Sequence, residues 1–512
     1  MNMIKPSTLA MIAKLFVMAI VDSLLVWMIY VALLGSDFLV GGVLVAILIA
    51  ANWVYFSKRT VAAKFLFPGT VLLVILVVVP IIYTAWMSTF NYKTGNQVSK
   101  DAAVAQLKLV GLVPDASGAT FDLKAGSSGS GHALLLTDQA THEVFLGTSA
   151  GLKPLAAGTY KLNSLNVAVS ADGFTPLKGK DLVTATEWIS SFEVPSTNGR
   201  YVLAQGLDIA ALMHEKFVFS KDLLTLKDTL SGVTYKDNGN GNYVDVSNKD
   251  NILFPGWQSF NPAQNYVGLI TNPKLSGPFF RVFVWTIAFA FITVAMMWAL
   301  GFVLALAMDK KIRLRGFYRA VLILPYAMPS FMSILIWAGI FNQNTGALNN
   351  LLGGAHIGWL TDPWLARGAI LLVNLWLGFP YFYLISTGAL QALPSDIEEA
   401  AEIDGATGSQ IFWQIKLPLV FQILSPLLIS SVAFNFNNFN LIYLLTHGGP
   451  TDVLNGETAG ATDLLITYAY KTAFGSNEQN LGLACSISVL MFVIVGALSM
   501  WSLRRSKVLE EM

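Results

Sequence analysis

Charge is the first thing that this sequence of 512 residues lacks. Only 12% of the residues are charged and 54% are apolar, whereas a soluble globular domain carries about 25% charged residues. This composition excludes an ordinary soluble enzyme. The 32 Lys and Arg residues nearly balance the 31 Asp and Glu residues, so the chain has no basic field that could hold nucleic acid. The sequence therefore predicts a membrane protein without a nucleic-acid partner.

Two kinds of chemistry are also missing. The single cysteine, Cys485, excludes an intrachain disulfide, and its apolar neighbours indicate ordinary packing. No G-x-x-x-x-G-K-[ST] motif occurs, and the one Gly-Lys pair, Gly179-Lys180, is followed by aspartate. That motif holds nucleotide phosphates with backbone amides and a lysine. We therefore expect no ATP site of this type, no metal site and no enzymatic activity in this chain.

Long apolar runs dominate what is present. A transmembrane helix needs about 20 mostly apolar residues, and eight stretches satisfy this condition: 11–34, 37–56, 68–90, 278–308, 317–341, 367–392, 419–446 and 481–503. The last five contain no Asp, Glu, Lys or His in their interiors, which argues against an ion-coupled carrier, because such carriers usually place ionisable groups at membrane depth. In the first stretch, Lys14 can reach the interface, while Asp22 needs a partner or a water-lined face.

Basic residues lie almost entirely on one side of these stretches. Cytoplasmic loops retain Lys and Arg, and placing the N-terminus inside assigns twelve of them to the cytoplasm: Lys5, Lys58, Arg59, Lys64, Lys310, Lys311, Arg313, Arg315, Lys416, Arg504, Arg505 and Lys507. We therefore predict that both termini are cytoplasmic. Residues 1–90 would hold three transmembrane helices, 91–277 an external domain, 278–503 a core of five transmembrane helices, and 504–512 a cytoplasmic tail.

The segment 91–277 has the composition of a soluble domain. It contains 15 basic and 16 acidic residues, nearly half of the charge in the chain. Short alternating runs such as 133–136 and 201–203 are separated by turn signals at 126–131 and 237–241, which is typical of strands. The second signal spaces Asp237, Asn240 and Asp245 loosely like a calcium loop, but the closing glutamate is absent. We expect a β-rich domain in which 237–241 is a plain hairpin turn.

Three of the apolar stretches carry uncharged polar residues at helical spacing. Each stretch has a set at positions i, i+3, i+4 and i+7, and residues at these offsets share one helix face. The sets are Tyr326, Pro329, Ser330 and Ser333; Asn374, Leu377, Gly378 and Tyr381; and Ser431, Phe434, Asn435 and Asn438. We refer to them as the three polar stripes.

Such residues can simply hydrogen-bond between helices, at about 0.6 kcal/mol each in a membrane. Three polar stripes together favour a ligand site, because amides bond hydroxyl groups and aromatic rings pack on the apolar face of a sugar. An anionic substrate would have required Arg or Lys. Pro325, Pro329 and Pro380 would also interrupt the helices locally, which is tolerated where a cavity or a neighbouring helix satisfies the freed carbonyls.

The loop between the sixth and seventh stretches, 393–418, is unexpectedly acidic. Five of the nine residues from Asp396 to Asp404 are acidic, although cytoplasmic loops favour positive charge. Ser395 and Glu398 form a candidate capping box and Gly405 can end the helix in a left-handed conformation. A second helical stretch would then end at Leu417-Pro418. A solvated surface helix is one interpretation, and a helix that seats in a basic groove of another protein is the other.

Here the sequence resembles a known family. Glu399-Ala400-Ala401, Gly405 and Ile415-x-Leu417-Pro418 match every fixed position of the EAA signature of ABC importer permeases, the loop that docks on ATPase subunits. Four further segments closely resemble the MalF family, the larger membrane subunits of maltose/maltodextrin importers: 324–330, 374–381, 434–439 and 448–450. That family also has three additional N-terminal spans followed by a large periplasmic domain, a layout that covers this whole chain.

The resemblance implies a type I ABC importer permease fold: an all-α polytopic membrane protein with eight transmembrane helices and an inserted β-rich periplasmic domain. Its implied partners are a MalG-like permease subunit, two copies of a MalK-like ATPase and a periplasmic maltose-binding protein. ATP and magnesium would be bound by the partner ATPase, and this chain would hold no cofactor. The implied location is the bacterial inner membrane, with 91–277 in the periplasm.

The resemblance also implies roles for individual residues. The family's sugar-contact positions fall on members of the polar stripes, to which the helical spacing adds Tyr326: Tyr326, Ser330, Asn374, Leu377, Gly378, Tyr381, Ser431, Phe434, Asn435 and Asn438. The ATPase-coupling positions are Glu398, Glu399, Ala400, Ala401, Glu402, Asp404, Gly405, Ile415, Leu417 and Pro418.

The expected function is import of maltose or maltodextrins by alternating access, with no covalent chemistry in this chain. Two alternatives stay open at this stage. One is import of another neutral oligosaccharide, such as trehalose or a different glucoside. The other is a membrane-anchored receptor that senses sugar with its external domain and moves no substrate.

Overall fold

The computed structural model describes residues 8–35, 37–57, 59–115, 117–129, 131–309, 312–451, 458–475 and 479–505. Contacts divide the chain into two units, Met1–Met87 and Ser88–Met512. Some features named above lie outside the described residues: Lys5, Lys58, Lys310, Lys311, Lys507 and the rest of the expected tail beyond 505.

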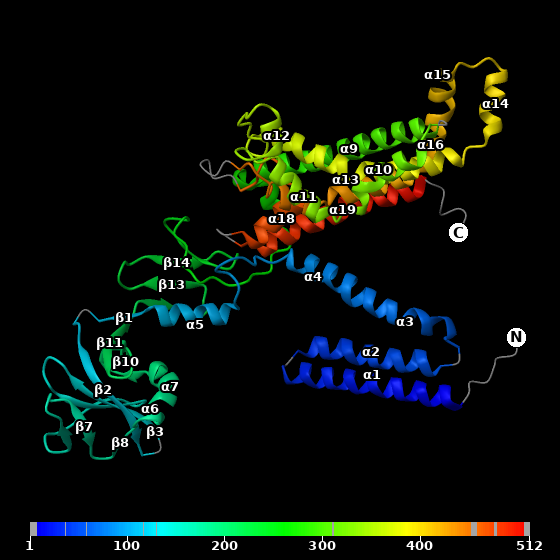
Figure 1. Ribbon diagram of the computed structural model, residues 1–512. Helices are drawn as coiled ribbons and strands as arrows, with labels where there is room; N and C mark the ends of the chain where they lie inside the picture. The colour runs from blue at the N-terminus through cyan, green and yellow to red at the C-terminus, as the bar shows by residue number, and fades with distance from the viewer. Residues whose placement is uncertain are drawn as a thin grey trace. The chain divides into compact units, whose positions relative to one another are not determined.

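The first unit is helical. α1 (Thr8–Leu34) and α2 (Phe38–Phe56) run side by side (Figure 1). α3 (Val61–Leu73) continues through a π-helical segment, η1 (Val74–Val78), into α4 (Val79–Met87). The third helix therefore covers 61–87 rather than 68–90, because helical backbone includes Lys64, which a count of uncharged residues leaves out. Asn52 Nδ2 donates to Asp22 Oδ1 at 2.9 Å, which supplies the partner that Asp22 was expected to need.

The second unit contains the β-rich domain expected from the sequence. Its first helix is α5 (Lys100–Val110), which begins where the Ser99 side chain accepts from the amide of Ala102. The strands of the larger sheet are β1 (Leu112–Pro114), β2 (Thr120–Ser128), β3 (Gly131–Asp138), β4 (Val144–Thr148), β5 (Gly151–Pro154), β6 (Tyr160–Leu162), β7 (Ala168–Ala171), β8 (Phe174–Pro176), β9 (Val194–Pro195), β10 (Arg200–Ala204) and β11 (Ile209–Glu215). The main path of this sheet, within the described residues, runs β5-β4-β3-β2-β11-β10-β9.

Both faces of the larger sheet are covered. Leu134 and Leu136 of β3 pack in a cluster with Ile189 of α7 (Thr186–Ser191), which follows α6 (Lys180–Thr184). Leu135, on the opposite face, packs with Phe174 of β8. The turn expected at 126–131 is shorter than predicted: Gly126 lies inside β2, against the carbonyl of residue 175. Its glycine serves this close approach between strands and not a turn.

A second sheet has four strands, β12 (Phe217–Phe219), β13 (Thr225–Asp228), β14 (Thr234–Asp237) and β15 (Tyr243–Asp245), in that order. α5 packs on it through Val104 and Leu107. β14 and β15 pair antiparallel with Asp237 opposite Tyr243, so the segment 237–241 is the hairpin turn that was expected. Asp237 also accepts from Lys100 Nζ at 2.8 Å.

The membrane part follows this domain. Its helices are α8 (Gln264–Thr271), α9 (Pro273–Asp309), α10 (Arg315–Ala327), α11 (Ser330–Ile340), α12 (Ala347–Leu351), α13 (Pro363–Gln391), α14 (Ser395–Ile403), α15 (Gly408–Gln410), the π-helical η3 (Ile411–Lys416), α16 (Leu417–Phe436), α17 (Phe439–Leu445), α18 (Leu465–Phe474) and α19 (Leu481–Arg505). Among the described residues of the whole chain, six helices are long and apolar enough to cross a membrane, or seven if α10 and α11 form one span, and α2 contributes a shorter apolar helix, 40–56.

Two expected spans are interrupted. The stretch 317–341 bends by 91° between α10 and α11, next to Pro329, whose ring cannot continue a helix without a break. The stretch 419–446 ends as a helix at Phe436, and α17 starts anew at Phe439. Apolar content alone cannot locate such breaks, because the residues on both sides remain apolar.

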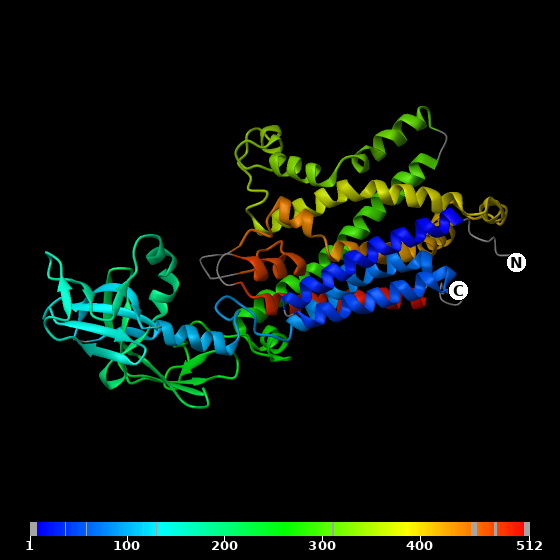
Figure 2. The same ribbon diagram turned by 90° about the horizontal axis from the view of Figure 1, so that it is seen from below.

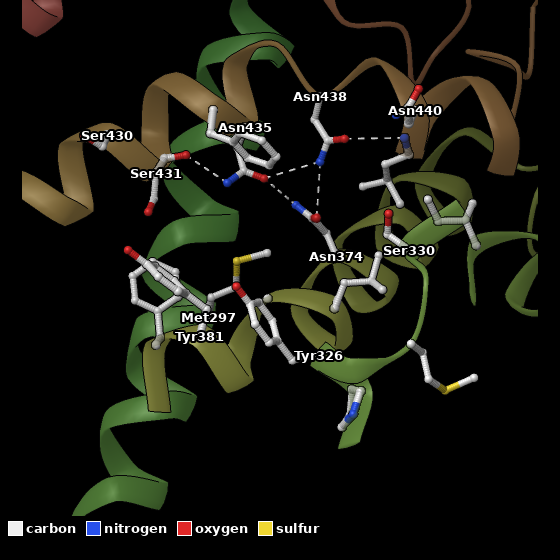
Figure 3. A pocket seen from close by; sticks show the side chains of 18 residues that line it. Met297, Tyr326, Ser330, Asn374, Tyr381, Ser430, Ser431, Asn435, Asn438 and Asn440 are labelled. Atoms are coloured by element: carbon white, nitrogen blue, oxygen red, sulfur yellow. Dashed lines mark hydrogen bonds between the residues drawn. The ribbon is translucent and has the colours of Figure 1, made fainter. Parts of the chain in front are cut away.

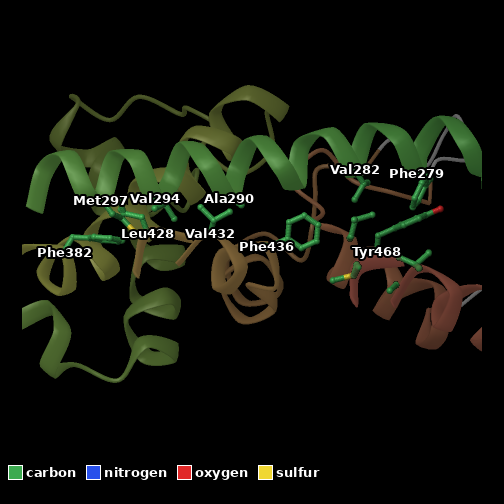
Figure 4. Close-up of a cluster of buried hydrophobic side chains, with 14 of the residues drawn as sticks. Phe279, Val282, Ala290, Val294, Met297, Phe382, Leu428, Val432, Phe436 and Tyr468 are labelled. Carbon is green, nitrogen blue, oxygen red and sulfur yellow. The ribbon is translucent and has the colours of Figure 1, made fainter. Parts of the chain in front are cut away.

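The helices of the second unit pack around α9 (Figure 4). Val294 and Met297 of α9 contact a cluster that includes Phe382 of α13, Leu428 of α16 and Tyr468 of α18. α9 approaches α13 closely at Gly301, where a Cβ would lie 2.6 Å from the backbone nitrogen of residue 383. Figures 1 and 2 show α14 and α15 projecting from the end of these helices that lies opposite α18.

Candidate functional site

A cavity of about 700 Å³ lies where α10, α11, α13, α16 and α17 meet, with Met297 of α9 at its wall (Figure 3). All ten residues expected to contact substrate line it: Tyr326, Ser330, Asn374, Leu377, Gly378, Tyr381, Ser431, Phe434, Asn435 and Asn438. The bend between α10 and α11 places Tyr326 and Ser330 on its two sides. The structure therefore brings the three polar stripes to one cavity, whose volume lies within the range of small-molecule sites.

Asparagine side chains form a hydrogen-bonded network at the cavity (Figure 3). Asn374 Nδ2 donates to Asn435 Oδ1 at 2.7 Å and to Thr293 Oγ1 of α9 at 3.0 Å. Asn438 Nδ2 donates to Asn374 Oδ1 at 3.3 Å, and Asn435 Nδ2 donates to the carbonyl of Ser431 at 2.9 Å. Asn374 thereby connects four helices. Buried amides that are already paired hold fixed orientations, which positions them for a ligand.

The rest of the lining is neutral and partly aromatic. Asn374 and Asn435 are 4% exposed, whereas Phe434 is 73% and Tyr326 58% exposed. No Asp, Glu, Lys, Arg or His is among the described residues that line the cavity. Amides, hydroxyls and rings without a charged group can bind a neutral ligand rich in hydroxyls. The same residues offer no acid–base pair for a chemical step.

The sequence reasoning missed several lining residues. Met297, Met328, Ile334, Phe382 and Leu441 are apolar residues without a sequence signal that separates them from packing residues. Ser430 and Asn440 also line the cavity. Asn440 escapes the helical spacing because α16 ends at Phe436, so that the helix phase is interrupted before residue 440.

Two members of the first polar stripe do not line the cavity. Ser333 is 2% exposed, and its hydroxyl donates to the carbonyl of Pro329 at 3.3 Å. Pro329 itself precedes α11. The four-residue interval assumed one continuous helix from 326 to 333, and the bend between α10 and α11 removes that continuity.

The acidic helix expected at 395–404 is α14 (Ser395–Ile403). In the described structure it has no buried residue, and Ile403 is 86% exposed. Gly405 has φ +83°, and the amide of Ala406 donates to the carbonyl of Ala401 at 2.9 Å. The expected left-handed end of the helix is thus confirmed.

The capping box expected at Ser395 and Glu398 is wrong. Pro394 is the N-cap residue, so Ser395 is already helical and its hydroxyl lies 3.4 Å from Asp396 Oδ1. Glu398 instead forms an ion pair with Lys416 at 2.7 Å. This pair joins α14 to η3, and a capping box occurs at Thr407 and Gln410 at the start of α15.

The second half of the EAA segment also differs from expectation. The helix does not end at Leu417-Pro418 but continues from Gly408 through η3 into α16 and on to Phe436. Pro418 lacks an amide hydrogen, and it stands in the first turn of α16, just after the π-helical residues, where that loss matters least. Ile415 and Leu417 are half-buried, whereas Glu399, Ala400, Glu402 and Asp404 are exposed.

Two family models match the chain. One, binding-protein-dependent transport system inner membrane component, matches residues 297–506, which include the cavity and α14. The other, N-terminal of TM subunit in PBP-dependent ABC transporters, matches residues 71–150. A solved bacterial ABC transporter involved in the import of alginate aligns with a TM-score of 0.40 and 19% identity, over 48% of this chain and 82% of that one.

Curated relatives match nearly the whole chain, and each is described as maltose/maltodextrin transport system permease protein MalF. The protein of Vibrio vulnificus (strain YJ016) is 35% identical over 468 residues, which cover 89% of this chain and 87% of the relative. Those of Salmonella typhimurium and Escherichia coli K12 are each 34% identical, over 90% of this chain and 89% of the relative. The chain is a helical membrane permease of the type I ABC importer fold with an inserted β-rich domain, and it belongs to the MalF family.

Proposed function

We propose that this chain is the permease subunit of an ATP-driven importer that carries maltose and maltodextrins across the bacterial inner membrane. The observation that carries the proposal is the cavity of about 700 Å³, at which amides, hydroxyls and rings from five helices converge without a charge among the described lining residues. Sugar hydroxyls can bond to Asn374, Asn435 and Asn438, and the rings of Tyr381 and Phe434 can pack on the apolar faces of the glucose units.

The exposed helix α14 is the proposed contact with the ATPase. Its carboxylates Glu399, Glu402 and Asp404 are exposed and would meet a basic groove of a MalK-like subunit. The Glu398–Lys416 pair holds α14 to η3, which continues directly into α16. Because α16 carries Ser431, Phe434 and Asn435, movement of α14 can reach the cavity through one helical element.

The remaining parts of the proposal concern the assembly. A MalG-like permease would complete the cavity, two MalK-like subunits would bind ATP and magnesium, and a periplasmic maltose-binding protein would deliver sugar to the side of the β-rich domain. This chain would hold no cofactor and catalyse no reaction. Both termini would be cytoplasmic and residues 91–277 periplasmic, as the distribution of Lys and Arg predicts.

Uptake measurements test this function. A bacterial strain that lacks its own maltose permease would be complemented with this chain and its partner subunits, and uptake of labelled maltose, maltotriose and trehalose would be compared. We expect ATP-dependent uptake of maltose and maltotriose. Uptake of trehalose alone would replace the substrate by another glucoside, and sugar binding without any flux would support a receptor.

A further inference from the structure

The first unit contains a groove that plays no part in the proposed transport path. α1, α2 and α3 enclose a cavity of about 750 Å³. Its walls run along α1 from Ala13 to Leu25 and along α3 from Phe67 to Leu72. Apart from Lys14 and Tyr55, the described lining residues are apolar. A long apolar groove with a cation at one end has the polarity of a phospholipid, with an acyl chain along the groove and a headgroup at that end.

The length of the groove corresponds to one leaflet of a bilayer. From Lys14 to Leu25 the helix advances by 11 residues, which at 1.5 Å per residue is about 16 Å. Half of the hydrocarbon thickness of a membrane is about 15 Å. An acyl chain whose headgroup lies at Lys14 would therefore reach the bilayer midplane near Leu25.

Three cations gather around the end of α2, near the mouth of the groove. Lys14 Nζ donates to the carbonyl of Tyr55 at 2.6 Å, and the Tyr55 hydroxyl donates to the carbonyl of Lys64 at 3.1 Å. Arg59 is exposed in the turn between α2 and α3. An ammonium group has three protons, so Lys14 keeps donors for an anion while it is bonded to Tyr55.

Acidic residues do not neutralise this end. The sequence of residues 1–87 contains only two carboxylates, Asp22 and Asp37. Asp22 accepts from Asn52, and Asp37 stands at the start of α2, the opposite end of that helix from Tyr55. Basic pockets between transmembrane helices bind the headgroups of anionic lipids, and the charges here are complementary to such a headgroup.

We propose that this groove binds one anionic phospholipid, with its phosphate held by Lys14, Arg59 and Lys64 and an acyl chain between α1 and α3. The orientation within the proposed function assigns it to the inner leaflet, while the binding itself does not depend on sugar transport. A zwitterionic headgroup is disfavoured because its own cation would meet the three basic side chains.

Native mass spectrometry of the purified transporter complex tests the site, with phosphatidylglycerol and phosphatidylcholine as probes. The double variant Lys14→Gln/Lys64→Gln keeps a donor for the Tyr55 carbonyl and removes two charges. At about fivefold per basic group near a membrane surface, it should weaken phosphatidylglycerol binding roughly 30-fold. The matched control, Lys178→Gln/Lys180→Gln, removes two exposed charges from the β-rich domain and should leave lipid binding unchanged.

A second variant tests the groove itself. Ala13→Phe places a ring in the groove and retains all three cations, so it should also release phosphatidylglycerol. Equal retention of phosphatidylcholine and phosphatidylglycerol, or unchanged binding in either groove variant, would overturn the proposal. So would retention of inorganic phosphate in place of lipid, or a photo-cross-link from position 17 to a protein subunit instead of a lipid. Sugar uptake is measured separately, so loss of transport alone leaves the lipid result intact.

Discussion

Replacing Asn435 by leucine tests the proposed sugar site most directly. Asn435 is 4% exposed and accepts from Asn374 at 2.7 Å. Leucine has a similar volume and suits a helix, but it offers a sugar hydroxyl no hydrogen bond. A buried polar group left without a partner costs about 1–3 kcal/mol. Taking about 2 kcal/mol, maltose should bind the variant roughly 30-fold more weakly.

The matched control lies two residues further along the chain. Asn437 is exposed, does not line the cavity, and donates to the carbonyl of Ala433 in its own helix at 3.2 Å. Asn437→Leu should therefore bind maltose as the unaltered protein does. The loss of the Asn374 bond in Asn435→Leu accounts for about 0.6 kcal/mol of packing, so the complex should still assemble.

Calorimetric titration of the purified complex with maltose, without the binding protein, measures the affinity of the cavity itself. Size-exclusion chromatography of the same samples measures assembly. An affinity for maltose within twofold of the unaltered complex, in a variant that assembles normally, would refute the assignment of Asn435. Equal weakening by Asn437→Leu would refute the geometry, because that side chain does not reach the cavity.

Three further predictions concern coupling, packing and pH. Glu399→Lys should abolish ATP-dependent uptake without loss of assembly, because it reverses an exposed charge of α14; Glu193→Lys in the β-rich domain is the control, and normal uptake by Glu399→Lys would contradict the coupling role. Gly301→Ala should lower the melting temperature of the complex, since overpacking against the backbone of residues 382 and 383 costs about 1–3 kcal/mol, whereas Gly368→Ala, with open space around it, should not. The Ser117 amide, followed by Arg200, holds the pKa of Asp115 below its usual range, so its contribution to stability is present above about pH 4 and is lost as the pH falls through the lowered pKa. Pepsin should thus cut 112–128 faster as the pH falls below 4, and Asp115→Asn should flatten that dependence; an unaltered pH dependence in this variant would be evidence against the role of Asp115.

Where periodicity failed, the reason is a break in the backbone. Ser333 shares the helical interval with Tyr326, yet the bend between α10 and α11 turns it into the protein, where it bonds to Pro329. Asn440 lies in the cavity although no stripe includes it, since the helix ends at Phe436. A spacing rule holds only while one helix continues, and sequence spacing alone does not mark where neighbouring helices make a break stable.

The acidic loop shows the same division. The composition of 396–404 and Gly405 were sufficient to predict a short exposed helix with a left-handed end, and both features are present. The capping box was assigned to Ser395, but Pro394 already occupies the flanking position and Glu398 pairs with Lys416, 18 residues away. Local motifs compete with partners that are distant in the chain, and only the folded arrangement decides between them.

By itself, the sequence determined which segments are apolar enough to enter a membrane, that a charged β-rich domain interrupts them, and which uncharged residues share helix faces. These properties follow from composition and local periodicity, which need no knowledge of neighbours. Tertiary structure alone decided where helices bend, which amides pair across α9, α13, α16 and α17, and that Met297 closes the cavity wall. Those outcomes depend on contacts between residues far apart in the chain, and the free energy of such contacts exists only once the helices have packed together.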